Sequence, residues 1–280
     1  MWWLVLAVIA NDGGVLLNGP SAAVYDPATD SVLVSNVNGP PWLRDNNGFI
    51  TEIASDGGVL SARWVKGGDA KVTLHAPRGL AVIEGRLFVA DIDTVRVFDR
   101  KTHAPVQEVK VLGASSIEGL VAFGSRLYLV DSGWRALADG GVEATGTDGL
   151  YAIETRAAKP VLKTLAKSRG LQHPRGLAVT PTTLYVTSST EPVMFTFDLA
   201  GHVRSTGTSL PYVASGGLFV KETELFVFTT AGVLRGKIAG DEWQSVSGEV
   251  ASPGLMGVDE AGSRAWLPSV SRGELTEVTW

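Results

Sequence analysis

Short runs of apolar and β-branched residues alternate with turn residues along most of the chain. One pattern runs from Ala76-Pro-Arg-Gly-Leu-Ala-Val82 to Leu87-Phe-Val-Ala-Asp91, and it returns as Pro174-Arg-Gly-Leu-Ala-Val179 with Leu184-Tyr-Val-Thr187. A looser copy begins at Glu118. Runs of this kind, bounded by turn dipeptides such as Asn-Gly and Asp-Gly, are typical of antiparallel β-strands joined by hairpins. The pattern therefore predicts an all-β fold built from one repeated unit.

The spacing of the repeat predicts the architecture. Four strands in about 40 to 50 residues correspond to one blade of a β-propeller. Equivalent positions recur at intervals of 40 to 57 residues, at Ala22, Gly79, Gly119, Gly176, Gly217 and Gly257. We therefore expect a six-bladed β-propeller with four-stranded antiparallel blades.

We expect the whole chain, residues 1–280, to form a single propeller domain. The sixth unit lacks a fourth strand, and the apolar run 2–10 supplies one if it pairs with the last strand and closes the ring. The same run is also compatible with part of an export signal, although no Lys or Arg precedes it and it is too short to span a bilayer. The expected blades span about residues 19–66, 76–112, 115–166, 173–207, 211–247 and 252–280, the last together with 2–10.

Composition narrows the class of protein. Hydrophobic residues make up 45% of the chain and there are 33 glycines, which indicates a packed, turn-rich globule. The formal net charge is -5, with Lys and Arg scattered, which argues against a nucleic-acid or anionic-membrane surface. No cysteine is present, so disulfides and thiolate sites are excluded. We expect a soluble monomer with a small-molecule ligand, no nucleic-acid partner and no membrane span; both a cytoplasmic and an exported location stay open.

Several strings resemble one family of propellers. Tyr25-Asp-Pro-Ala-Thr-Asp30, Val34-Ser-Asn-Val-Asn-Gly39 and the Pro-Arg-Gly-Leu-Ala-Val repeats resemble the senescence marker protein (regucalcin)/gluconolactonase family. These motifs are shared with other six-bladed propellers of the NHL, paraoxonase and strictosidine-synthase-like groups. The resemblance implies a hydrolase of small lactones or esters, or of phosphotriesters, at the mouth of the central channel. It also implies a divalent cation there, often calcium, held by Glu, Asn and Asp side chains.

The family's cation ligands are largely replaced in this chain. Ser21 and Ala22 stand where the first Glu is expected, and Arg175 stands where an Asn is expected. An arginine within a ring of ligands repels a dication. We therefore expect either no metal or a rebuilt calcium site whose oxygen ligands come from Glu118, Asp131 and Asp91.

The residues at the start of the inner strands carry the candidate chemistry. Arg78 and Arg175 are suited to bind a carboxylate, a phosphate or a lactone carbonyl, because a planar guanidinium matches two oxygens. Glu118 or Asp131 would then act as the general base on water. In the alternative interpretation, the two arginines pair with Glu118, Asp91 and Asp131 in a buried ring of charges.

Two long loops and one histidine complete the candidate site. Blades one and three are longer than the others because of loops near residues 37–47 and 132–148. We expect Trp42, Trp134 and Asn36 to contact a substrate, and His173 to act as a base on the rim; each of the aromatic and His side chains could equally be a loop anchor. Two functions stay open: a gluconolactonase-like hydrolase, and a non-catalytic propeller that binds a small anion or a protein partner.

Overall fold

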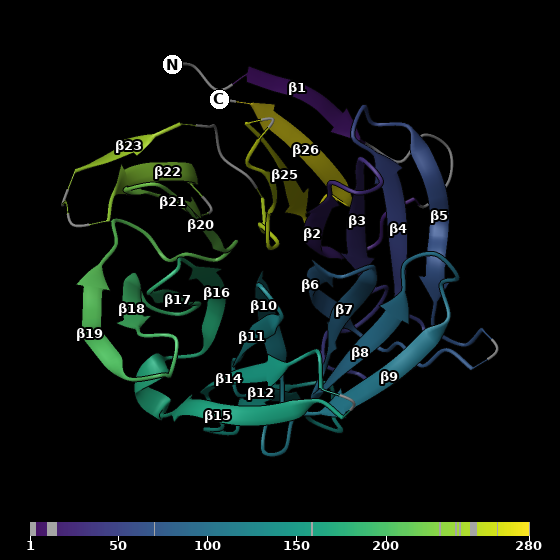
Figure 1. Ribbon diagram of the computed structural model, residues 1–280, viewed down its shortest axis with the longest axis horizontal. Helices are drawn as coiled ribbons and strands as arrows, with labels where there is room; N and C mark the ends of the chain where they lie inside the picture. Colours follow the sequence, from purple (N-terminus) through teal and green to yellow (C-terminus); the bar gives the residue numbers. More distant parts are fainter. Residues whose placement is uncertain are drawn as a thin grey trace.

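The protein is a six-bladed β-propeller (Figure 1). The computed structural model describes residues 4–9, 16–69, 71–157, 159–229, 231–238, 240, 242–246, 251–261 and 263–279. Within these ranges the chain forms β-strands and one short 3-10 turn, η1 (Arg169–Leu171). None of the described helical segments is long and apolar enough to cross a membrane. The predicted all-β fold class is therefore confirmed.

Each blade is an antiparallel sheet of four strands whose first strand lies nearest the ring axis (Figure 1). Blades one and two consist of β2 (Pro20–Asp26), β3 (Ser31–Asn36), β4 (Phe49–Ala54) and β5 (Val59–Lys66), and of β6 (Pro77–Ile83), β7 (Arg86–Asp91), β8 (Thr94–Asp99) and β9 (Pro105–Lys110). Blade three consists of β10 (Ile117–Phe123), β11 (Arg126–Asp131), β14 (Gly149–Glu154) and β15 (Val161–Lys167), with the small hairpin β12 (Trp134–Ala136) and β13 (Val142–Ala144) inserted between its second and third strands.

The other three blades repeat the pattern. Blade four consists of β16 (Pro174–Val179), β17 (Leu184–Ser188), β18 (Val193–Phe197) and β19 (Val203–Ser209). Blade five consists of β20 (Leu218–Lys221), β21 (Glu224–Thr229), β22 (Gly232–Lys237) and β23 (Trp243–Ser245). Blade six consists of β24 (Gly257–Asp259), β25 (Arg264–Ser269), β26 (Glu274–Thr279) and, as its outer strand, β1 (Leu4–Ile9).

The N-terminal strand closes the ring, as predicted. β1 pairs antiparallel with β26, so that Leu4 lies opposite Thr279 and Ile9 opposite Leu275. Figure 1 shows β1 and β26 side by side at this blade. The closure matters because it gives the outermost C-terminal strand a hydrogen-bonded neighbour. The beginning and end of the predicted run, residues 2, 3 and 10, lie outside the described residues.

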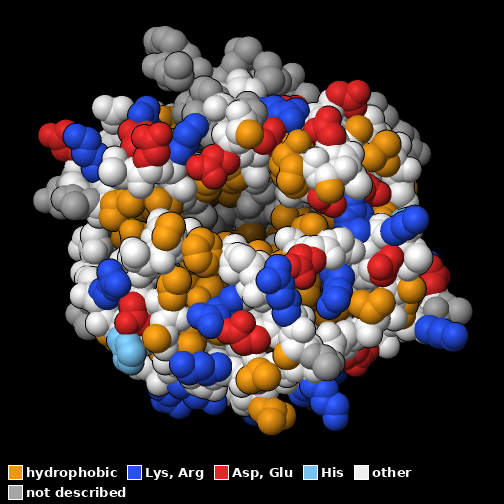
Figure 2. All heavy atoms as spheres, in the orientation of Figure 1, with side chains coloured by type: hydrophobic (Ala, Val, Ile, Leu, Met, Phe, Trp, Pro, Cys, Tyr) orange, Lys and Arg blue, Asp and Glu red, His pale blue; other side chains and the backbone are white. Residues whose placement is uncertain are grey.

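Apolar side chains fill the wedges between neighbouring blades. Leu33 and Trp64 of blade one pack with Leu87 and Phe98 of blade two. The next wedge repeats this arrangement between blades two and three. Figure 2 shows one face of the resulting ring: hydrophobic side chains lie around a central hollow, and charged side chains of both signs are spread over the blades. Burial of these wedges is the main force that holds the blades together.

Glycines let the first strands approach each other closely at the centre. A Cβ atom added to Gly79 would lie 2.3 Å from the backbone oxygen of Glu118 in the next blade. A Cβ atom added to Gly119 would lie 2.4 Å from the backbone oxygen of Arg175. Both contacts are with backbone, so no side chain can move aside. The repeated glycines are therefore required by the distance between the first strands.

Gly79→Ala should lower the free energy of unfolding by about 1–3 kcal/mol or more, because the added methyl group forces blades two and three apart. Gly58→Ala is the matched control: it lies in an exposed turn, where the nearest atom to the new Cβ is a carboxylate oxygen at 3.3 Å. Denaturant unfolding of both variants measures the difference. Equal stability of the two variants would contradict the packing role of Gly79.

Candidate functional site

A pocket of about 510 Å³ lies at the end of the channel where the first strands begin. All six blades contribute to its lining, through residues such as Ser21, Arg78, Glu118, Arg175, Ser215 and Pro253. Trp42 and Trp134 line it as well, each from one of the two long loops. We call it the channel pocket. Pockets that combine apolar walls with a few convergent polar groups are the usual place for a ligand.

The channel narrows directly behind this pocket. A void of only about 40 Å³ lies there. Its lining includes Leu80, Leu120 and Leu177, each of which comes two positions after Arg78, Glu118 or Arg175, together with Leu218, Leu255 and Met256. A void of this size is too small for an organic ligand. Ligands therefore reach the channel pocket from the face on which the two long loops lie.

Three charged side chains from consecutive blades meet in the channel pocket. Arg78 donates a hydrogen bond from Nη1 to Oε2 of Glu118 at 2.6 Å, and these side chains are only 9% and 4% exposed. Nε of Arg175 lies 3.8 Å from the same oxygen. We call these residues the charge cluster. Two guanidinium groups share one carboxylate, so the cluster carries one net positive charge.

Glu118 has a donor at each of its carboxylate oxygens. Its other oxygen, Oε1, accepts a hydrogen bond from Oγ of Ser116 at 3.2 Å, and Oγ of Ser132 lies 3.4 Å away, sharing its one hydroxyl proton between Oε1 and the backbone oxygen of Ser116. Both serines are buried. A buried carboxylate needs such partners, because the free energy of removing its charge from water is large. The chain supplies them with a short ion pair and two hydroxyl groups.

Arg175 is only partly satisfied. Its Nε is buried and has no hydrogen-bond partner among the residues that the structure describes. Burial lowers the pKa of Arg175, the nearby carboxylate of Glu118 raises it, and the second cation, Arg78, lowers it again. An arginine still remains protonated at neutral pH. Its unused donor therefore favours an anion in the channel pocket.

The loop 37–47 of blade one covers part of the channel pocket. Nε1 of Trp42 donates a hydrogen bond to Oγ of Ser116 in blade three at 2.6 Å. The guanidinium carbon of Arg78 lies 4.9 Å from the centroid of the Trp42 ring, within the range of a cation–π contact. Trp42 also adopts a φ of 69°, a left-handed conformation that aromatic residues rarely adopt. Its indole is thus held in one place over the charge cluster.

Other residues anchor the same loop to blade two. Nη2 of Arg44 lies 2.6 Å from Oδ2 of Asp93, which also pairs with Lys110. Asn46 accepts a hydrogen bond from the backbone of Leu74 and donates its own backbone N–H to Nδ1 of His75. Burial tends to raise the pKa of Asp93, but the hydrogen bonds and charges of Arg44 and Lys110 outweigh it and lower the pKa to about 2.

Trp134 forms a second fixed wall. It begins β12 and stacks on the ring of His173, with centroids 4.0 Å apart and an angle of 16° between the planes. Nδ1 of His173 lies 2.6 Å from the backbone oxygen of Ser132, so this nitrogen carries the proton. Trp134 is among the lining residues, whereas His173 is not among those described at the pocket. The catalytic role of His173 stays a prediction, and its geometry here is that of a support for Trp134.

The carboxylates of Asp91 and Asp131, at the ends of the second strands, accept hydrogen bonds from backbone N–H groups. Asp91 accepts hydrogen bonds from the backbone N–H groups of His75 and Ala76 and pairs with Arg96. Asn36 has the equivalent role in blade one, accepting from the backbone of Asn18. These contacts fix the connection that leads into the first strand of each blade.

Asp131 accepts from the backbone of Ser115, Ser116 and Gly133 and from the hydroxyl of Thr147. Burial raises the pKa of Asp131, and these hydrogen bonds oppose the rise. Asp131, Asp91 and Asn36 are not among the described residues that line the channel pocket. The roles predicted for them in catalysis, metal binding and substrate binding therefore stay predictions.

The charge cluster does not suit a dication. Among the described residues, no group of three or more His, Asp or Glu side chains is placed to hold a metal ion. Glu118, the carboxylate that lines the channel pocket, is flanked by two guanidinium groups, which would repel calcium. A calcium site built from Glu118, Asp131 and Asp91 remains a prediction that this donor set does not support.

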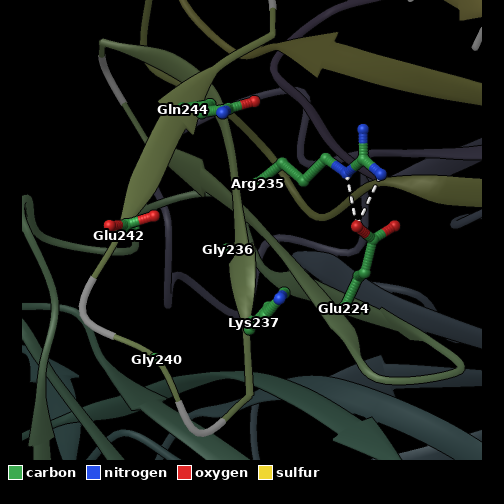
Figure 3. A pocket seen from close by; sticks show the side chains of 7 residues that line it. All are labelled: Glu224, Arg235, Gly236, Lys237, Gly240, Glu242 and Gln244. Atoms are coloured by element: carbon green, nitrogen blue, oxygen red, sulfur yellow. Dashed lines mark hydrogen bonds and ion pairs between the residues drawn. The ribbon is translucent and has the colours of Figure 1, made fainter.

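A second hollow lies on the outer strands of blade five. Glu224, Arg235, Lys237, Glu242 and Gln244 line it (Figure 3). Arg235 and Glu224 point toward one another there, and both Nε and Nη2 of Arg235 donate to Oε1 of Glu224. The other side chains that Figure 3 draws do not converge on one point. The channel pocket therefore remains the candidate functional site.

The comparisons with known proteins identify the fold. A solved structure of a luciferin-regenerating enzyme is similar, with a TM-score of 0.66 over 94% of this chain and 92% of that chain. The chain shares that enzyme's propeller fold. The sequence identity is only 13%, so the likeness extends to the fold and not to the activity. No protein-family model matches the chain, and no curated protein does.

Sequence reasoning missed several residues of the site. Ser116 and Ser132 support Glu118, and Asp93 anchors the blade-one loop. Strand alternation offered a signal for Ser116, because residues two apart face the same side of a strand. No comparable signal marked Asp93.

Arg78→Ala should lower the free energy of unfolding by about 3–5 kcal/mol, because it leaves the Glu118 carboxylate without its closest cation. Arg135→Ala is the control, since Arg135 pairs with Glu143 at the surface and such pairs contribute about 0–1 kcal/mol. Adding Glu118→Ala to Arg78→Ala should recover part of the loss. Chemical denaturation measures all three, and equal losses in the two single variants would overturn the role of the buried pair.

Acid should release the anchor of the blade-one loop. The native Asp93 carboxylate stays charged down to a pKa of about 2, while its ordinary pKa is 3.8. Its contribution to stability is therefore fully present above pH 3.8 and is lost as the pH falls toward 2. Asp93→Asn should be less stable than the natural protein at pH 6, and the difference should vanish near pH 2. Thermal unfolding at several pH values checks this; a difference independent of pH would contradict it.

Proposed function

We propose that the channel pocket binds a small organic anion. The observation that carries the proposal is the charge balance of the cluster: two guanidinium groups, one buried and one partly buried, face one carboxylate, and Nε of Arg175 keeps an unused donor. A bound anion would neutralise the remaining charge and supply the missing acceptor. The channel narrows behind the pocket and the two long loops cover part of its front, which shields such an interaction from solvent on these sides.

Hydrolysis of a lactone or ester is the second candidate. It is supported by the family resemblance of the sequence, by the enzyme with a similar fold, and by a carboxylate that lies beside two arginines. In this reaction Arg175 would polarise the acyl oxygen and Glu118 would accept a proton from water. The water oxygen bonds to the acyl carbon, the bond from that carbon to the ring oxygen breaks, and the proton passes to the departing oxygen. The product is a hydroxy acid, which is itself an organic anion.

The contacts of Glu118 favour binding over turnover. A general base needs a lone pair directed at its water, and most lone pairs of Glu118 already face a donor: Oε2 accepts from Arg78, and Oε1 lies within hydrogen-bond distance of two serine hydroxyls. Proton transfer to Glu118 would also leave Arg78 and Arg175 without the negative charge that offsets theirs. Anion binding requires no such change, because Arg175 is already free to donate.

Glu118→Gln separates the two candidates. Removal of the negative charge should raise the net charge of the cluster and tighten the binding of gluconate or acetate, measured by calorimetry. If the protein is a hydrolase, the same variant should lose about 100-fold or more of its rate on δ-gluconolactone, followed by acid release in the presence of EDTA. A melting curve confirms that the variant folds.

The outcomes are distinct. Absence of binding by the natural protein for every small anion would overturn the proposal. Lactone turnover that Glu118→Gln abolishes would establish the hydrolase in its place.

A further inference from the structure

Two buried polar atoms without partners lie on neighbouring blades of the channel pocket. They are Nε of Arg175 and Oγ of Ser215, neither of which has a hydrogen-bond partner among the described residues. Arg175 lies in β16, and Ser215 lies shortly before β20. The first strands of these blades touch here, because a Cβ added to Gly176 would lie 3.1 Å from Cα of Gly217. A buried donor without a partner destabilises a protein, unless a ligand or water accepts its hydrogen bond.

On the opposite side of the same pocket, the buried side-chain atoms of the described lining residues have partners. Nη1 of Arg78 donates to Glu118, and the hydroxyls of Ser116 and Ser132 lie at the other oxygen of Glu118. The Trp42 indole donates to Ser116. A ligand that took Nη1 of Arg78 or the Trp42 indole as its partner would have to replace one of these hydrogen bonds. The unsatisfied donors are therefore on the side of blades four and five, and the anionic group of a ligand belongs on that side.

The charge of the cluster limits the charge of the ligand. With two arginines and one glutamate, a single negative charge makes the buried site neutral. A second charge would be buried without a partner, which is costly. A carboxylate also has two oxygens, one for the Arg175 guanidinium and one for the Ser215 hydroxyl. These features favour a monocarboxylate over a phosphate or a dicarboxylate.

The walls of the pocket indicate the shape of the uncharged part of the ligand. Trp42 and Trp134 are both fixed before any ligand binds, one by its hydrogen bond to Ser116 and the other by its stack on His173. Pro41 and Pro253 add further rigid apolar surface. Flat, immobilised aromatic walls favour a flat aromatic partner, because little conformational entropy is lost on contact. A volume of about 510 Å³ accommodates one or two fused rings with a carboxylate.

We infer that the ligand of the channel pocket is an aromatic monocarboxylate, with its carboxylate on Arg175 and Ser215 and its ring against Trp42 and Trp134. This inference rests on the proposed anion binding and specifies the chemical class of the anion. Trp42, Arg175 and Ser215 are then the residues that determine specificity.

Calorimetry with matched probes tests the inference on the natural protein. The probes are 2-naphthoate, its saturated counterpart decalin-2-carboxylate, the methyl ester of 2-naphthoate, and inorganic phosphate. We expect 2-naphthoate to bind about tenfold or more tightly than each of the other three, since the ester lacks the charge and decalin lacks the flat ring.

Variants test the placement of the ligand. Arg175→Gln and Ser215→Ala should each weaken the binding of 2-naphthoate, by about tenfold or more for the arginine. Arg135→Gln is the matched control: it makes the same change in net charge on an exposed arginine of the blade-three hairpin and should leave the affinity unchanged. Trp42→Leu should weaken 2-naphthoate more than decalin-2-carboxylate, because only the flat ring loses its stacking partner. Melting curves establish that each variant is folded.

Each contrary result would overturn one part of the inference. Equal affinity for 2-naphthoate and decalin-2-carboxylate would overturn the aromatic body while anion binding stands. Equal affinity for the acid and its methyl ester would overturn the requirement for a carboxylate. This comparison uses the natural protein, so it does not depend on the folding of a variant. Equal affinity in Arg175→Gln and Arg135→Gln would overturn the placement. Absence of binding for every anion, phosphate included, would overturn the proposed function and this inference together.

Discussion

The close approach of the first strands around the ring axis is the constraint on which the rest of the structure depends. At Gly79 and Gly119 there is no room for a side chain, because the backbone of the next blade lies where a Cβ would be. The residue before each of these glycines therefore occupies the start of a first strand, at the mouth of the channel. Arg78 and Glu118 are these residues, and Arg175 precedes the equivalent Gly176 in the next blade. The same packing that builds the ring thus brings their charges together.

The two sides of the charge cluster differ in their hydrogen bonds: Glu118 has several donors, whereas Nε of Arg175 has no partner among the described residues. Around Glu118 the chain provides an ion pair and two serine hydroxyls, and Trp42 reaches from blade one to donate to one of those serines. The blade-one loop and the buried carboxylate therefore stabilise each other. Around Arg175 the chain provides a carboxylate only at 3.8 Å. One side of the pocket is a finished structural network, and the other side retains donors for a ligand.

Repetition made the fold and half of the site predictable from sequence. Positions that recur along the chain must recur around the ring, so the equivalence of Arg78, Glu118 and Arg175 already placed them together. Closure by the N-terminal run followed from a sixth unit that lacked one strand. The roles of Asp91 and Asp131 could not be read in this way, because an acid at the end of a strand can bind a ligand or accept backbone hydrogen bonds. Only coordinates show that both carboxylates are used by the backbone.

Contacts between loops are outside the reach of a repeat pattern. The hydrogen bond from Trp42 to Ser116 joins residues 74 apart in the sequence, and nothing in the repeat relates the two positions. This contact nevertheless decides what the cluster can do. Because Ser116 both accepts from Trp42 and donates to Glu118, a water that gave a proton to Oε1 of this carboxylate would compete with the hydroxyl that holds the loop. An anion on Arg175 competes with neither, so the geometry of this propeller favours holding a ligand over cleaving one.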